Sequence, residues 1–150
     1  MEKTIAVERS IWIEAPIEKA WYAVTEPTQL DQWYATRYRW AIPMLQVGTQ
    51  VKFYNKDDAE DFQIATIEIV DPPREFSLRW QADRQYPEII LVTSFLLVEE
   101  NTGTRVTIHE SGYELLPENL RQQWIDATDH GYTMSMENLK AHLEGRSLQY

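Results

Sequence analysis

The chain has 150 residues, 43% of them hydrophobic and 12% aromatic, which is the composition of a globular domain rather than of a disordered segment. Its 24 acidic and 14 basic residues give a formal net charge of −10, which disfavours a nucleic-acid backbone or an anionic membrane surface as partner. The absence of cysteine excludes disulfide bonds and thiolate chemistry. We therefore expect one domain spanning residues 1–150.

The N-terminal segment MEKTIAVERS carries charges where a secretory signal peptide has its apolar core. No stretch of the sequence reaches the roughly 18 consecutive apolar residues that a transmembrane helix needs. These two features predict a cytoplasmic protein that is not inserted into a membrane.

Alternation of apolar and polar residues predicts a first strand over residues 4–14, with Arg9 interrupting its apolar face. Helical spacing then predicts two short helices, over residues 17–26 and 28–33, separated by Pro27. The sequence therefore begins with a strand followed by two short helices.

Period-two alternation returns after the second helix and predicts six further strands, the weakest over residues 38–42. The most apolar pattern, over residues 89–98, predicts a strand covered on both faces. A proline and a glycine bracket a helical pattern over residues 118–144, about 40 Å long at ~1.5 Å per residue. Together these elements predict an α+β fold, in which a curved seven-stranded antiparallel sheet surrounds a long C-terminal helix.

Four segments of the chain resemble the signature blocks of one family. They are IWIEAPIEKAWYAVTEPTQLDQW (residues 11–33), IEIVDPPREFSLRW (67–80), GTRVTIHESGY (103–113) and HGYTMSMENLKAHLEG (130–145). They resemble the START-like (SRPBCC) superfamily, in the subgroup of homologues of the activator of the heat-shock chaperone ATPase. This resemblance implies a helix-grip fold, with a cavity for a small apolar ligand between the sheet and the long helix. The chain departs from the family pattern at Glu110, where many members carry histidine.

Two charged residues, Arg9 and Glu110, interrupt the predicted inward faces of the first and last strands. These strands are neighbours in a helix-grip sheet, so we expect the two side chains to face each other inside the cavity. Three interpretations stay open: a structural ion pair, a polar anchor that orients a ligand's carboxylate or hydroxyl, and a general acid or base at Glu110.

The chain is rich in aromatic residues, with six tryptophans, eight tyrosines and four phenylalanines. Periodicity predicts that six large apolar residues point inward: Trp33, Phe53, Trp80, Phe95, Tyr132 and Met136. Each of them alone would simply fill the core, but together they are suited to wall a cavity. Tyr38, Trp40 and Trp124 are expected at the rim of that cavity.

No pattern in the sequence indicates a metal, a nucleotide or another cofactor. The three histidines, His109, His130 and His142, lack the spacing of metal ligands, and no glycine-rich phosphate loop or nucleophile motif occurs. We therefore predict no metal site, no cofactor and no identifiable catalytic residue.

The outer face of the most apolar strand carries a row of apolar residues. Its members are Ile90, Val92, Leu96 and Val98, and Trp12 points outward from the first strand. A loop covering this row, a homodimer interface and a surface for another protein are the alternatives.

The sequence favours a binding protein that holds a small hydrophobic or amphipathic ligand, with Arg9 and Glu110 as polar groups and the six inward apolar residues as walls. A cavity enzyme of the cyclase or hydrolase type, using Glu110 as its acid–base group, is the first alternative. The second is an interaction module with a chaperone partner, as the family name suggests. The chaperone activators carry a further domain, for which 150 residues leave no room.

Overall fold

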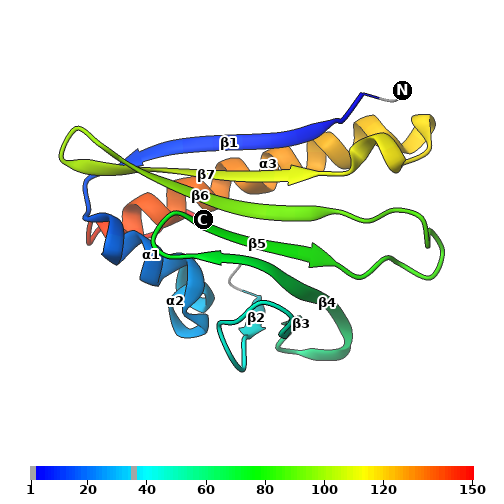
Figure 1. Cartoon of the computed structure of the whole chain (residues 1–150), viewed down its shortest axis with the longest axis horizontal. Helices are drawn as coiled ribbons and strands as arrows, with labels where there is room; N and C mark the ends of the chain where they lie inside the picture. Colours follow the sequence, from blue (N-terminus) through cyan, green and yellow to red (C-terminus); the bar gives the residue numbers. More distant parts are fainter. Residues whose placement is uncertain (1–2, 35–36) are drawn as a thin grey trace.

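The protein is described from a computed structural model that covers residues 3–34 and 37–150. A seven-stranded antiparallel sheet in this part of the chain curls around the C-terminal helix (Figure 1). The elements in chain order are β1 (Ala6–Ile13), α1 (Ile17–Thr25), α2 (Pro27–Trp33), β2 (Tyr38–Ala41), β3 (Gln50–Asn55), β4 (Asp58–Asp71), β5 (Glu75–Trp80), β6 (Val92–Glu100), β7 (Gly103–Ser111), the 3-10 helix η1 (Tyr113–Leu115) and α3 (Glu118–Leu143). The predicted α+β helix-grip fold is confirmed.

The strand order is β1-β7-β6-β5-β4-β3-β2, so that β1 and β2 form the two edges of the sheet. The first and last strands pair as expected, with Arg9 opposite Ile108 and Val7 opposite Glu110. β6 begins at Val92, later than predicted, because its pairing with β5 starts where Val92 lies opposite Arg79. Residues 81–91 form the β5–β6 connection instead, which reaches out at one end of the molecule (Figure 1).

The long helix is buried along only one half of its length. Its buried residues are Tyr132, Ser135, Met136, Asn138, Leu139, Ala141 and Leu143, all of which follow Gly131. This C-terminal half is tied to the end of α2, because the Asn138 amide donates to the Trp33 carbonyl at 3.3 Å and the Ser135 hydroxyl donates to the Tyr34 carbonyl at 3.1 Å. The N-terminal half of α3 has no fully buried side chain among its described residues, and it covers the sheet less tightly.

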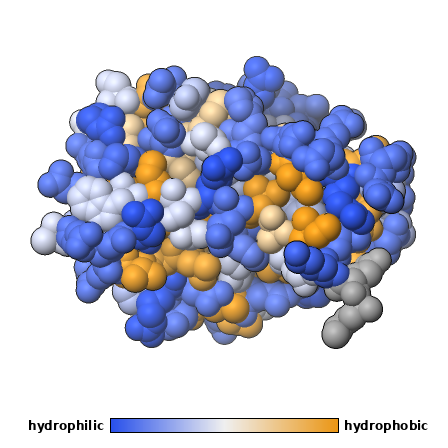
Figure 2. All heavy atoms as spheres, turned by 90° about the horizontal axis from the view of Figure 1, so that it is seen from above, coloured by the Kyte–Doolittle hydropathy of each residue, from blue (hydrophilic) through white to orange (hydrophobic). Residues whose placement is uncertain are grey.

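The outer face of the sheet is less covered than the sequence predicted. On β6, Val98 is 63% exposed, so the expectation that both faces of this strand are covered is wrong. Ile90 is also exposed, while Val92 and Leu96 are half-buried. Figure 2, which looks down on the β1 edge, shows mostly hydrophilic atoms with apolar atoms in separate patches. Among the described helices, none is both long enough and apolar enough to cross a bilayer.

Candidate functional site

A cavity of about 620 Å³ lies between the sheet and the N-terminal half of α3. Aromatic rings form much of its wall, contributed by Tyr34, Phe53, Trp80, Tyr86, Tyr113 and Trp124. The exposed residues Phe62, Asp83 and Arg84 also border it and mark its mouth. Its volume falls within the range of about 300–1,000 Å³ that is usual for small-molecule sites.

The inner wall of the cavity is built by the end of β7 and the turn that follows it. Alternation along β7 places Val106, Ile108 and Glu110 on the inward face, and Glu110 is the last of them. Gly112 then adopts a φ of 112°, a left-handed conformation that favours glycine, and a Cβ at this position would collide with the Ile90 carbonyl oxygen. This turn brings Tyr113 back over Glu110.

Glu110 is the one charged residue that is buried in the described part of the chain, with 8% of its surface exposed. Its Oε1 accepts a hydrogen bond from the Tyr113 hydroxyl at 2.6 Å. Its Oε2 accepts two, from the hydroxyls of Thr93 at 2.5 Å and Tyr132 at 2.8 Å. Three hydroxyl donors from β6, η1 and α3 therefore hold the carboxylate in a fixed position.

A second layer of contacts orients these donors. The Trp80 indole N–H donates to Thr93 Oγ1 at 2.8 Å, and Thr128 Oγ1 lies 2.8 Å from the Tyr113 hydroxyl oxygen. Arg121 donates to the carbonyl oxygens of Tyr113, Glu114 and Leu116, which fixes the η1 turn onto α3. The side chains around Glu110 are therefore locked by elements from both sides of the cavity.

The three tyrosines nearest Glu110 stay protonated because of where they lie. Burial, followed by the negative charge of Glu110, raises the pKa of Tyr34 and Tyr113 above the ordinary value of 10. Burial also raises the pKa of Tyr132, with further contributions from Tyr34 and Glu110. Their hydroxyls consequently remain hydrogen-bond donors at physiological pH.

The structure brings some of the predicted site residues together and separates others. Phe53, Trp80 and Glu110 line the cavity, and Tyr132 supports Glu110 from behind. The other three predicted wall residues, Trp33, Phe95 and Met136, are at most 2% exposed and belong to the core rather than to the cavity wall. They lie in the half of the molecule where α3 is buried, which leaves no space beside them.

The expected encounter between Arg9 and Glu110 is wrong. The Arg9 side chain is 48% exposed, and its Nε and Nη2 each donate to a carboxylate oxygen of Asp129 on α3, both at 2.7 Å. The guanidinium hydrogen bonds hold the pKa of Asp129 below its usual value of 3.8. The physical reason is that β1 is an edge strand, so its inward face meets the margin of α3 and solvent rather than the closed interior.

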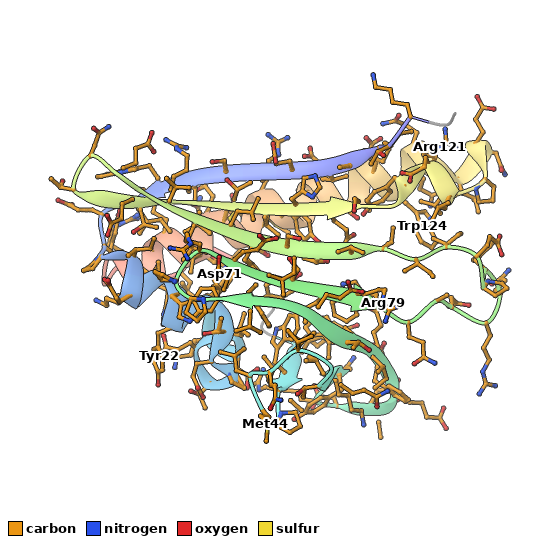
Figure 3. All side chains as sticks on the ribbon, in the orientation of Figure 1. Tyr22, Met44, Asp71, Arg79, Arg121 and Trp124 are labelled. Atoms are coloured by element: carbon orange, nitrogen blue, oxygen red, sulfur yellow. The ribbon has the colours of Figure 1, made fainter. Side chains whose placement is uncertain are left out.

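Of the three residues predicted at the rim, the structure places one in the cavity wall. Trp124, on the N-terminal half of α3 (Figure 3), lines the cavity. Its ring meets Tyr86 edge-on with centroids 6.2 Å apart, so that α3 contacts the β5–β6 connection there. Trp40 is instead buried and packs on Tyr34 and Phe53. The Tyr38 hydroxyl donates to Asp61 at 2.7 Å, and Tyr38 is not part of the cavity wall.

The surroundings of Glu110 are completed by four residues that the sequence patterns did not predict as site residues, Tyr34, Thr93, Tyr113 and Thr128. A signal for Tyr113 was present, because a glycine between it and Glu110 is typical of a tight turn. Thr93 and Thr128 lie within an apolar strand pattern and on an apolar helix stripe, and these patterns do not separate a threonine that supports a site from one that fills the core.

The chemical groups of the cavity wall include one buried carboxylate and several aromatic rings. Among the described residues, no group of three histidine, cysteine or acidic residues is placed to bind a metal ion. Glu110 supplies a buried hydrogen-bond acceptor, and the aromatic rings supply apolar contact area.

Residues 14–144 match the family model described as Activator of Hsp90 ATPase homolog 1-like protein. The chain belongs to this family. Its fold is the START-like (SRPBCC) fold that the sequence resemblance implied. No curated protein matches the chain in sequence.

Several solved structures are similar to this member of the Activator of Hsp90 ATPase homolog 1-like family. Protein MLL2253 from Mesorhizobium loti has 23% identity and a TM-score of 0.77, over 97% of this chain and 100% of that chain. The Aha1 dimer from Colwellia psychrerythraea has 18% identity and a TM-score of 0.72, over 93% and 96%. DynU16, a putative protein in the dynemicin biosynthetic locus, has 21% identity and a TM-score of 0.73, over 97% of this chain and 49% of that chain. At these identities the likeness shows the fold alone.

Proposed function

We propose that this protein binds a small hydrophobic or amphipathic molecule in the cavity between the sheet and the N-terminal half of α3. The observation that carries the proposal is a space of about 620 Å³ whose wall combines aromatic rings with a single buried carboxylate, Glu110. Such a site buries the apolar part of a ligand, while one polar group of the protein fixes the ligand's orientation. The family membership supports a ligand-binding domain of this type.

The contacts of Glu110 favour binding over catalysis. A general acid or base needs a path for its proton to the reacting group, and enzymes commonly pair it with a second titratable group. Here no histidine or second carboxylate is hydrogen-bonded to Glu110 among the described residues. The cyclase or hydrolase alternative therefore gains no support from the site.

A fluorescence titration with the neutral dye N-phenyl-1-naphthylamine tests the proposal. We expect saturable binding to the wild-type protein, with quenching of tryptophan emission because Trp80 and Trp124 lie in the wall. The variant Ala82→Trp places a large ring in the lining and should weaken binding at least about tenfold, since the dye and the ring compete for one space.

The matched control is Ala127→Trp, which adds the same ring at an exposed position of α3 outside the cavity wall. It should bind the dye as the wild type does. Absence of binding to the wild type, or equal binding by the Ala82→Trp variant, would contradict the proposed function.

Self-association through the outer face of the sheet is a second candidate. Val98 is 63% exposed and Ile90 is 40% exposed on that face, and a structurally similar protein is an Aha1 dimer. Native mass spectrometry should then show a dimer that Val98→Glu reduces to monomer. A monomeric wild type would exclude the dimer and leave the cavity proposal untouched. The chaperone partner stays a prediction of the resemblance alone.

A further inference from the structure

Within residues 3–34 and 37–150, no positively charged side chain forms an ion pair with the buried carboxylate of Glu110. The ion pairs between described residues all involve other acidic groups, and none of them includes Glu110. Arg84 is the basic residue that lines the cavity within the described ranges, and it is exposed at the mouth. A buried charge without a counter-charge is costly, so a cation that entered the cavity would be stabilised at this position.

The hydrogen bonds of Glu110 leave one acceptor position open. Each carboxylate oxygen can accept two hydrogen bonds. Both positions of Oε2 are used by Thr93 and Tyr132, whereas Oε1 accepts one bond, from Tyr113. Tyr113 and its neighbour Thr128 line the cavity, while Thr93 and Tyr132 do not. Oε1 is therefore the oxygen of Glu110 whose hydrogen-bond donor belongs to the cavity wall, and it has one acceptor position left.

The aromatic wall adds a second attraction for a positive group. The faces of tryptophan, tyrosine and phenylalanine rings carry negative electrostatic potential and attract cations. Tyr34, Phe53, Trp80 and Trp124 line the same cavity as Glu110. The net charge of −10 further favours the approach of a cation over that of an anion.

We propose that the cavity selects aromatic amines, with the protonated amine donating to Glu110 Oε1 and the aromatic body packed against Trp80 and Trp124. This proposal rests on the proposed function and names the class of ligand for the same site. It assigns Glu110 as the residue that determines specificity, and the hydroxyls of Thr93, Tyr113 and Tyr132 as the groups that position it.

Three probes with one naphthalene ring test the proposal by isothermal titration calorimetry: 1-naphthylmethylamine, 1-naphthalenemethanol and 1-naphthoic acid. We expect the wild type to bind the amine at least about tenfold more tightly than the alcohol, because a charge-assisted hydrogen bond is stronger than a neutral one. The acid should bind most weakly, since its carboxylate repels that of Glu110. This comparison uses the wild-type protein and does not depend on the folding of any variant.

Substitution then assigns the preference to one residue. Glu110→Gln keeps the shape of the side chain and removes its charge, so it should abolish the preference for the amine while the alcohol still binds. Glu118→Gln removes one negative charge from an exposed position at the start of α3 and should leave the preference unchanged. Thermal unfolding of both variants checks that they fold.

The outcomes separate this inference from the proposed function. Equal binding of amine and alcohol by the wild type would overturn the inference, while the cavity would remain a binding site. A preference that survives in the Glu110→Gln variant would equally overturn it. If the naphthalene probes and N-phenyl-1-naphthylamine all fail to bind, both proposals are wrong.

Discussion

The same sheet and helix pack closely at one end of the molecule and leave a cavity between them at the other. At the closed end, Trp33 has no exposed surface, meets Phe95 edge-on with centroids 6.4 Å apart, and donates its indole N–H to the Ala23 carbonyl at 2.9 Å. At the cavity end, Trp124 is half-buried and lines an open space. The difference follows from the sequence of α3. The segment ENLRQQWIDATDHG (residues 118–131) is too polar to seal the sheet, whereas residues 132–143 include all the buried side chains of the helix.

The largest effect should come from removing Trp33. Trp33→Ala should lower the free energy of unfolding by about 3–5 kcal/mol, because it leaves a void in a fully packed region and removes the hydrogen bond to Ala23. Trp124→Ala at the cavity end should cost about 1 kcal/mol, since that ring already borders empty space. Urea unfolding of the two variants measures the contrast directly. Equal losses would show that the two ends do not differ in packing.

The turn at Gly112 should give the next largest effect. Gly112→Ala places a Cβ against the Ile90 carbonyl at a φ of 112°, and we expect a loss of about 2–3 kcal/mol. Gly48→Ala is the matched control, because Gly48 also has a positive φ but no atom within 4 Å of the added Cβ. The control should lose only about 1 kcal/mol. Thermal denaturation of both variants checks this order, and the reverse order would refute the proposed collision.

The closed end should also show a dependence on acid pH that resides in Glu144. The Glu14 backbone N–H, together with Lys140, lowers the pKa of Glu144 from 4.5 to about 2. A carboxyl group whose pKa is lowered by folding stabilises the protein fully above pH 4.5 and loses this contribution as the pH falls toward 2. Glu144→Gln should therefore cost about 1 kcal/mol at pH 7, and the difference from the wild type should shrink below pH 4.5. A difference that is constant from pH 7 to pH 2 would contradict this assignment.

The smallest predicted effect is an increase in the free energy of unfolding, from a substitution at Gly131, where the two halves of α3 meet. Gly131 is inside the helix, and nothing lies within 4 Å of the position that a Cβ would take. Gly131→Ala should stabilise the protein by about 0.5–1 kcal/mol through helix propensity alone. Dye binding should not change, because Gly131 is not part of the cavity wall. A destabilised variant would indicate that the helix needs to bend at this residue.

The fold was predictable because its signals are local. Alternation placed the seven strands, and helical spacing placed α3 to within one residue of its observed end at Leu143. Arg9 shows where local reasoning fails, since its side chain does point toward the helix layer but the position of β1 at the sheet edge leaves it in solvent.

The cavity could be predicted only in part for a related reason. Periodicity predicts that Phe53 on a strand and Trp33 on a helix both point inward, yet Phe53 lines the cavity and Trp33 fills the core. Which of them borders empty space depends on how closely α3 approaches the sheet at each point, and this is decided by packing between distant segments. The support of Glu110 by Tyr113 depends on the left-handed turn at Gly112, whose direction alternation does not reveal.

Only the C-terminal half of α3 has fully buried side chains, and this bears on which positions can change during evolution or protein engineering. The buried residues of α3 lie at one end of the molecule, and the residues that would contact a ligand lie at the other. Cavity-wall positions such as Ala82, Leu91 and Trp124 can therefore be exchanged at modest cost to folding, since none of the three side chains is fully buried. Such a fold can acquire new ligands through substitutions in the cavity wall. The fluorescence of Trp124 would change when a ligand binds there.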